Sequence, residues 1–148
     1  MFGFLKAADF NDEQLGILQY VRGKWRGKIN ISDNNTVVVA MSGDRKQPHN
    51  QILEAARQLP AQYALLKPQI QQALYEHYEP YADESPVKIR NDASLWKDVR
   101  LVQATIEIQS GKLTTELAYE VTWDEEHTLG AVIVEGKFAE LNGSILVA

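Results

Sequence analysis

Residues 113–123, Leu-Thr-Thr-Glu-Leu-Ala-Tyr-Glu-Val-Thr-Trp, are the stretch that decides the fold. Alternate side chains of a β-strand lie on opposite faces, so a period of two predicts a strand here. The inward positions are apolar and the outward ones polar: Leu117, Tyr119, Val121 and Trp123 face the core, and Glu116, Glu120 and Thr122 face solvent. The strand is therefore expected to carry one core face and one solvent face.

The segments on either side continue this pattern as an antiparallel meander. The expected strands cover residues 99–108, 113–123, 129–134, 137–141 and 144–147. Asn142-Gly143 is the best two-residue hairpin turn in the chain, because both residues tolerate a positive φ. It predicts that the last strand is short and separate. Residues 124–128 are expected to form a loop.

An N-terminal β-hairpin is predicted before the meander. Residues 21–31 alternate with a period of two, and residues 36–42 contain the β-branched run Val37-Val38-Val39. The turn-forming residues 32–35 separate the two. The outward face of the first strand is basic, since it carries Arg22, Lys24, Arg26 and Lys28.

This basic face has two interpretations. Cations beside aromatic side chains can line a nucleic-acid groove, where they meet phosphates and the aromatics stack on bases. However, Trp25 falls on the opposite face of a regular strand from the cations. The other interpretation is an exposed strand face whose cations lie opposite Glu116 and Glu120 on a neighbouring strand. We favour the second interpretation and expect no nucleic-acid partner.

Two helices are expected between the hairpin and the meander. Apolar residues at helical spacing over 47–59 predict the first, and Pro60 is expected to end it, because the residue before a proline disfavours helical geometry. The second is expected over 61–78, kinked or started late by Pro68. The fold class is therefore predicted as α+β, a single domain over residues 1–148 with both helices packed on one face of an antiparallel sheet.

Composition excludes several kinds of site. The chain has 148 residues, a net charge of −5 and no cysteine, which excludes disulfides and thiolate sites. Residues 1–50 carry seven Lys/Arg and five Asp/Glu, a balance of +2, whereas residues 51–148 carry eight and fifteen, a balance of −7. An acidic body favours a basic partner if charge matters. Without a long apolar run or a recognisable leader, the protein is expected to be soluble and cytoplasmic, with no membrane partner.

Residues 122–130 hold the best candidate site. Asp124, Glu126 and His127 bring two carboxylates and an imidazole within four residues, which suits a hard metal ion or an acid–base pair. On an extended loop, however, Glu126 and His127 point in opposite directions. A structural role explains the same residues: Asp124 bonds backbone N–H groups of the turn, Trp123 fills the core, and His127 bonds a carbonyl. We favour the structural role.

The same block carries a family resemblance. Thr122-Trp123-Asp124-Glu125-Glu126-His127 with Leu129-Gly130 resembles a Thr-Trp-Asp-x-Glu-His-Gly-Leu-Gly motif of uncharacterised bacterial domain proteins. Residues 25–27, 73–78 and 135–137 resemble that group as well. Thr128 stands where the motif has glycine, so a left-handed turn there is less accessible. The resemblance implies no established activity, and it places immunity proteins, which neutralise toxins, among the relatives.

Two functional hypotheses follow. The favoured one is a non-catalytic, immunity-like protein-binding module without a cofactor, whose acidic surface meets a basic partner. The alternative is a small metal-dependent hydrolase that uses Asp124, Glu126 and His127, with His77 brought in by the fold.

Overall fold

Eight strands form one sheet in which the order across the sheet is the order along the chain, from β1 at one edge to β8 at the other. The computed structural model describes residues 6–147. Residues 1–5, part of the stretch in which no leader was recognised, lie outside this range. The strands are β1 Phe10–Asp12, β2 Gly16–Val21, β3 Lys24–Ser32, β4 Asn35–Met41, β5 Val99–Gln109, β6 Lys112–Val121, β7 Asp124–Val134 and β8 Lys137–Ile145.

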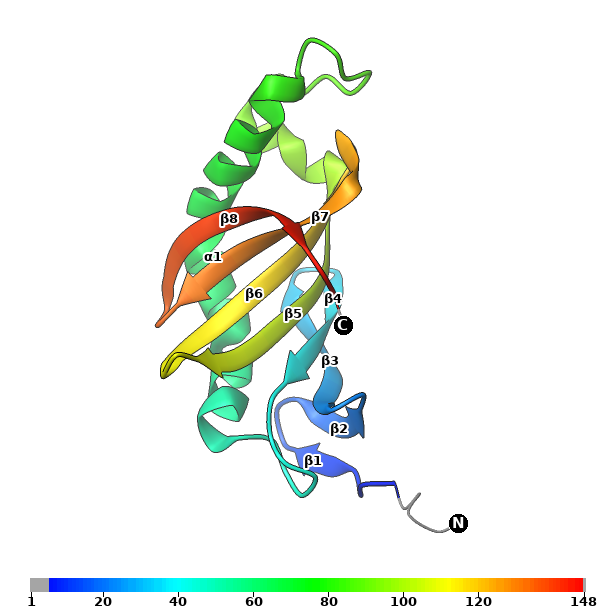
Figure 1. Cartoon of the computed structure of the whole chain (residues 1–148), viewed down its shortest axis with the longest axis vertical. Helices are drawn as coiled ribbons and strands as arrows, with labels where there is room; N and C mark the ends of the chain where they lie inside the picture. The colour runs from blue at the N-terminus through cyan, green and yellow to red at the C-terminus, as the bar shows by residue number, and fades with distance from the viewer. Residues whose placement is uncertain (1–5, 148) are drawn as a thin grey trace.

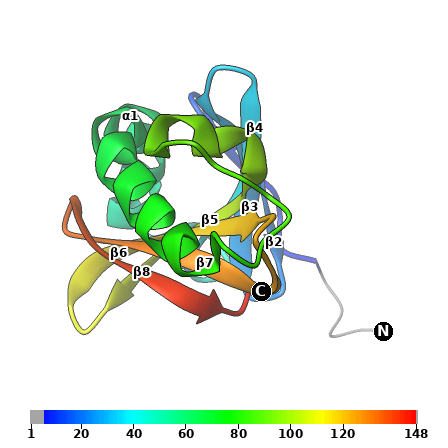
Figure 2. The same cartoon turned by 90° about the horizontal axis from the view of Figure 1, so that it is seen from above.

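The predicted antiparallel sheet with two helices is wrong, although the architecture remains of α+β type. The sheet is mixed, because β4 and β5 run parallel while all other neighbours are antiparallel. A parallel pair requires a crossover connection. The long helix α1 (Asn50–Tyr78) supplies it and lies along one face of the sheet (Figures 1 and 2).

One helix forms where two were expected, because the buried stripe runs past both prolines. Nine of its side chains are buried: Ile52, Leu53, Ala56, Leu59, Tyr63, Leu66, Ile70, Leu74 and Tyr78. Burying a large apolar side chain contributes about 1.5–3 kcal/mol, against about 3 kcal/mol lost at each interior proline. Pro68 is exposed and Pro60 half-buried, so neither interrupts the packed face.

The N-terminal hairpin exists, but its first strand begins later than predicted. Arg22 and Gly23 have φ values of 52° and 80°, and they form a tight turn that separates β2 from β3. The regular alternation of residues 21–31 therefore contained a hairpin turn at its start. Trp25 is fully buried, as the alternation predicted.

The predicted neighbours of the basic face are wrong. β3 lies between β2 and β4, far in strand order from the β6 strand that carries Glu116 and Glu120. Lys24 instead pairs with Glu107 at 3.5 Å. The parallel crossover causes this difference, since it places β5 rather than β6 next to the hairpin.

The end of the meander also differs from the prediction. β8 is continuous through Asn142-Gly143, so no separate last strand forms. The Asn142 side chain accepts a hydrogen bond from the Ser144 N–H at 3.1 Å. This backbone N–H is therefore hydrogen-bonded although the chain does not reverse direction here. The true β6–β7 turn is Thr122-Trp123, and β7 already begins at Asp124.

The core lies between α1 and the covered face of the sheet. The hydroxyl of Tyr119, fully buried on β6, donates to the Tyr63 hydroxyl of α1 at 3.2 Å. Two short 3₁₀ helices, η1 (Glu79–Tyr81) and η2 (Asp92–Asp98), lead from α1 to β5. Asn91 caps η2, because its side chain accepts a hydrogen bond from the Ser94 N–H. Among the described residues, no helix is both long and apolar enough to cross a membrane.

Candidate functional site

The structure brings two of the three predicted site residues together. Asp124 is buried at the start of β7, and both its carboxylate oxygens lie within hydrogen-bond distance of His127 Nδ1, at 2.9 and 3.0 Å. The Tyr81 hydroxyl donates to the same carboxylate at 3.3 Å. Asp124 and His127 therefore bond each other's side chains rather than the backbone groups that the turn interpretation expected.

Glu126, the third predicted site residue, is exposed. Burial, followed by the negative charges of Asp124 and Glu126, raises the pKa of Tyr81 above its usual value. In the part of the chain that the structure describes, no group of three His, Asp or Glu side chains could hold a metal ion.

His77 joins the neighbourhood from the end of α1. The Trp123 indole N–H donates to His77 Nδ1 at 3.0 Å, and the imidazole stacks on Tyr81 with 5.6 Å between ring centroids. Burial lowers the pKa of His77, the Asp124 charge opposes this, and the nearby His127 adds to it. A neutral ring that accepts at Nδ1 carries its proton on Nε2. The ring thus links the turn at Trp123 to the helix.

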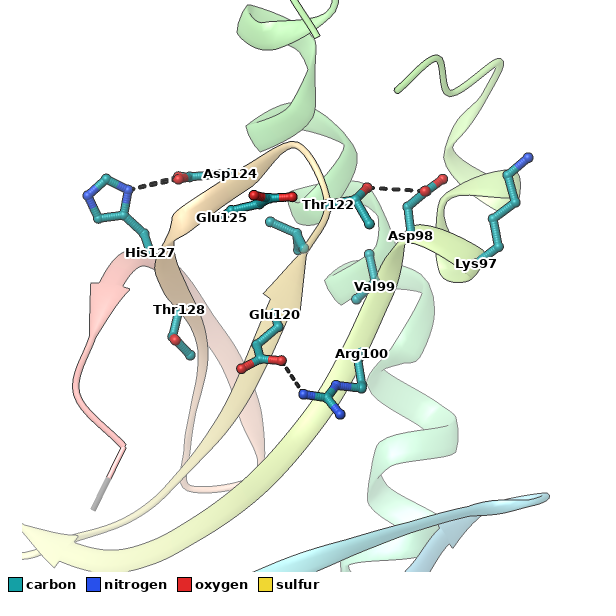
Figure 3. A pocket seen from close by; sticks show the side chains of 11 residues that line it. Lys97, Asp98, Val99, Arg100, Glu120, Thr122, Asp124, Glu125, His127 and Thr128 are labelled. Carbon is teal, nitrogen blue, oxygen red and sulfur yellow. Dashed lines mark hydrogen bonds and ion pairs between the residues drawn. The ribbon is translucent and has the colours of Figure 1, made fainter. Parts of the chain in front are cut away.

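A cleft of about 500 Å³ opens between the end of η2 and the β6–β7 turn (Figure 3). Its walls come from the end of η2 with the start of β5, the end of β6 and the start of β7. In Figure 3 the side chains of Glu125 and Thr122 lie on the side of the β6–β7 turn that faces Asp98, while the His127 ring points away from them. Because His127 lines the cleft and its side chain is 45% exposed, its imidazole reaches solvent.

Negative side chains outnumber positive ones around this cleft. The carboxylates are Asp98, Glu120, Asp124 and Glu125, and the Lys/Arg cations are Lys97 and Arg100. Arg100 is bound to Glu120 across the β5–β6 pair. After this pairing, three carboxylates face Lys97 and the partly exposed His127, so the cleft suits a positively charged ligand.

Asp98 has unused hydrogen-bonding capacity. Its Oδ1 accepts from the Thr122 hydroxyl at 3.1 Å, whereas its Oδ2 is buried without a partner among the described residues. An unsatisfied buried polar atom costs about 1–3 kcal/mol, and more when it is charged. A donor that enters the cleft would relieve this cost after a small rotation of the carboxylate.

Sequence reasoning included Thr122 in the candidate block but missed Asp98 and the Arg100–Glu120 pair as parts of the same site. Residues 98–100 lie at the start of the first meander strand, and the site forms only where this segment meets the β6–β7 turn. The one available signal was that Asp98 directly precedes a strand that pairs with the strand before Thr122.

The chain matches a known domain family over most of its length. Residues 14–145 match the family described as a domain of unknown function, DUF6985. The chain belongs to this family. The match agrees with the resemblance to an uncharacterised domain family, and it carries no information on the motif, on bacterial origin or on immunity proteins. No curated protein and no solved structure matches this DUF6985 chain.

Proposed function

We propose that this DUF6985 protein is a non-catalytic binding module whose acidic cleft receives an arginine or lysine side chain of a basic partner protein. The excess of carboxylates around the cleft is the observation that carries the proposal. Charged lining of one sign concentrates ligands of the opposite sign and speeds their association. The net charge of −5 acts in the same direction at long range.

Asp98 gives the cleft a specific contact for such a side chain. A guanidinium can donate to carboxylate oxygens in two parallel hydrogen bonds, and the free Oδ2 of Asp98 offers one acceptor. Glu125, exposed on the same side, offers another. The partner class we propose is a basic protein such as a toxin domain, in line with the resemblance to immunity proteins.

The alternative, a metal-dependent hydrolase, receives less support. The Asp124–His127 pair orients an imidazole toward solvent, as an acid–base role requires. Glu126 does not line the cleft, and the His77 Nδ1 accepts a hydrogen bond from Trp123. The binding module is therefore the function that we carry forward.

Calorimetric titration with a short peptide of alternating arginine and serine tests the proposal. The double variant Asp98→Asn/Glu125→Gln is expected to bind about tenfold more weakly, because two charge-assisted contacts are lost. The double variant Asp83→Asn/Glu84→Gln removes the same charge from an exposed segment away from the cleft and serves as the control. Equal losses in the two double variants, or no binding by the wild-type protein, would contradict the proposal.

A further inference from the structure

A second groove, of about 440 Å³, lies between α1 and the sheet, where β6 begins and β7 ends. It is distinct from the acidic cleft, which lies at the other ends of the same two strands. One wall is the first half of α1, and the other is the start of β6 with the β7–β8 turn. The helix contributes Gln51, Glu54, Ala55, Gln58 and Gln62 to the lining, and the sheet contributes Leu113, Thr115, Ile133, Glu135 and Gly136.

Three glutamines of the helix wall form a straight row along the groove. Gln51, Gln58 and Gln62, with Ala55 between the first two, are spaced by four, three and four residues, so all four lie on one stripe of α1. With a rise of about 1.5 Å per residue, Gln58 and Gln62 are about 6 Å apart along the helix. An extended chain repeats every two residues, about 6.6 Å. The amide spacing of this glutamine row therefore matches the spacing of peptide groups in an extended chain laid along the groove.

The amides of the glutamine row have hydrogen-bonding capacity to spare. Within residues 6–147, the side chains of Gln51 and Gln62 form no hydrogen bond, and Gln58 donates only to Glu54, at 3.2 Å. A glutamine amide both donates and accepts, as a peptide group does, so the two can pair in either sense. A Cβ at Gly136 would lie 3.4 Å from Gln62 Nε2, so a larger residue in the β7–β8 turn would crowd this amide.

The sheet wall of the groove is held in place. The Glu135 N–H donates to the Leu113 carbonyl at 2.9 Å, and the Leu113 N–H donates to Glu135 Oε1 at 3.1 Å. These reciprocal bonds tie the β7–β8 turn to the start of β6. A wall that is formed before a ligand arrives lowers the entropy lost on binding.

We propose that this groove binds an extended, non-acidic peptide segment of a partner protein, whose backbone peptide groups pair with the glutamine row and one of whose aliphatic side chains enters at Ala55. An extended segment presents peptide groups that need partners, whereas a helical segment has already paired its own. Backbone pairing supplies affinity in many peptide complexes, and a side-chain pocket supplies specificity.

Shape and charge support this occupant. Ala55 is the one short side chain in the glutamine row, so it leaves a notch, and Leu113 and Ile133 add apolar atoms to the lining. The charged residues of the described lining are Glu54 and Glu135, without Lys or Arg. Carboxylates on the ligand would therefore meet like charges, which disfavours an acidic segment. The net charge of −5 acts in the same direction.

NMR titration of the ¹⁵N-labelled protein tests the proposal with three probes: an end-capped peptide of alternating serine and valine, the same peptide with glutamate for serine, and a neutral glucose oligomer. The serine–valine peptide is expected to shift the side-chain amide signals of the glutamine row and the backbone amides of residues 113–115 and 133–136. The double variant Gln51→Ala/Gln62→Ala should bind it about tenfold more weakly, because two amide contacts are lost. Alanine keeps the helix intact. Ala55→Leu, which fills the notch, should weaken binding as well.

The matched control is Gln69→Ala/Gln72→Ala, which removes two exposed amides of α1 outside the groove. Unchanged affinity of the control together with the loss in the groove variant supports the site. The proposal is overturned if the serine–valine peptide does not bind, if it shifts other residues instead, or if both double variants weaken binding equally. Equal affinity for the glutamate peptide would overturn the selection by charge, undiminished binding to Ala55→Leu would overturn the notch, and tighter binding of the glucose oligomer would overturn the peptide as occupant. None of these outcomes depends on the Asp98 cleft.

Discussion

Replacing Asp12 by alanine should destabilise the protein by about 3 kcal/mol, because this carboxylate ties the N-terminal strands to the helix. Its side chain is 4% exposed, and its Oδ2 accepts from the N–H groups of Gln14 and Leu15 at 3.0 and 2.9 Å. The Arg57 Nε of α1 donates to Oδ1 at 3.1 Å. Each hydrogen bond to a buried charged acceptor contributes about 1.5–3 kcal/mol, and the two backbone bonds alone give the estimate. Arg57 is partly exposed and regains water when the pair is lost, so it adds little.

The pH dependence makes this prediction specific. The Arg57 hydrogen bond, with help from the two backbone N–H groups and against the effect of burial, lowers the pKa of Asp12 below its usual value. A carboxyl with a lowered folded-state pKa contributes stability above its unfolded pKa of about 3.9, and this contribution disappears as the pH falls through the folded-state pKa. The difference in the free energy of unfolding between wild type and Asp12→Ala should therefore be largest near pH 7 and should shrink as the pH falls below about 4.

Urea denaturation at neutral and acidic pH measures both effects. Asp12→Asn keeps one acceptor oxygen and should lose about half as much stability as Asp12→Ala. Asp83→Ala, at an exposed position, should stay within about 0.5 kcal/mol of wild type. A loss below about 1 kcal/mol for Asp12→Ala, or one that does not change with pH, would refute this account of Asp12.

Three further predictions follow from buried contacts. Tyr63→Phe should lower the free energy of unfolding by about 1–3 kcal/mol in chemical denaturation, because it leaves the Tyr119 hydroxyl unpaired. Adding Tyr119→Phe should recover most of the loss, and additive losses would contradict this account. Gly27→Ala should lower the free energy of unfolding by about 1–3 kcal/mol, since the new Cβ would lie 2.4 Å from Leu18 Cδ2 in the core. Unchanged thermal unfolding would contradict this and show that Leu18 repacks freely. His77 should titrate below pH of about 6.5 by NMR, so its share of stability is lost as the pH falls below this value; an ordinary or raised pKa would contradict the inferred burial.

The helix shows what local rules predict and where packing overrides them. The two proposed segments held a single apolar stripe from Ile52 to Tyr78, and its spacing continues across Pro60 and Pro68. Proline rules describe a cost at one residue, whereas the stripe sums the burial of nine side chains. Comparing these two magnitudes would have predicted one helix, and with it a crossover long enough to make β4 and β5 parallel.

The candidate cleft depends on a detail that alternation does not show. Counting back from the Gln109–Lys112 turn places Arg100 opposite Val121 in a regular hairpin. A register shift between Leu101 and Gln103 moves Arg100 opposite Glu120, where the two form an ion pair. A bulge inserts one residue and changes every pairing beyond it. The strands were therefore predictable, whereas the charge pairs at their far ends were not.

The surroundings of the Asp124–His127 pair were likewise not predictable from the strand pattern. Both residues were singled out from the sequence, and their spacing of three suited a contact across an irregular strand start. Tyr81, Trp123 and His77 complete the neighbourhood because the end of α1 reaches the β6–β7 turn, which is a long-range consequence of the crossover. Local pattern identified the acid and the imidazole, but only the fold supplied their partners.

The cleft accounts for part of the uneven distribution of charge along the chain. The balance of −7 in residues 51–148 includes its carboxylates. A basic ligand at the cleft is attracted by both the local and the net charge. Beyond a Debye length of about 10 Å at 0.1 M salt, the attraction of the net charge is screened, whereas partly buried contacts are screened much less. Added salt should therefore weaken the binding of a basic peptide only in part, and the part that persists at high salt separates specific contacts with Asp98 and Glu125 from a general attraction between opposite charges.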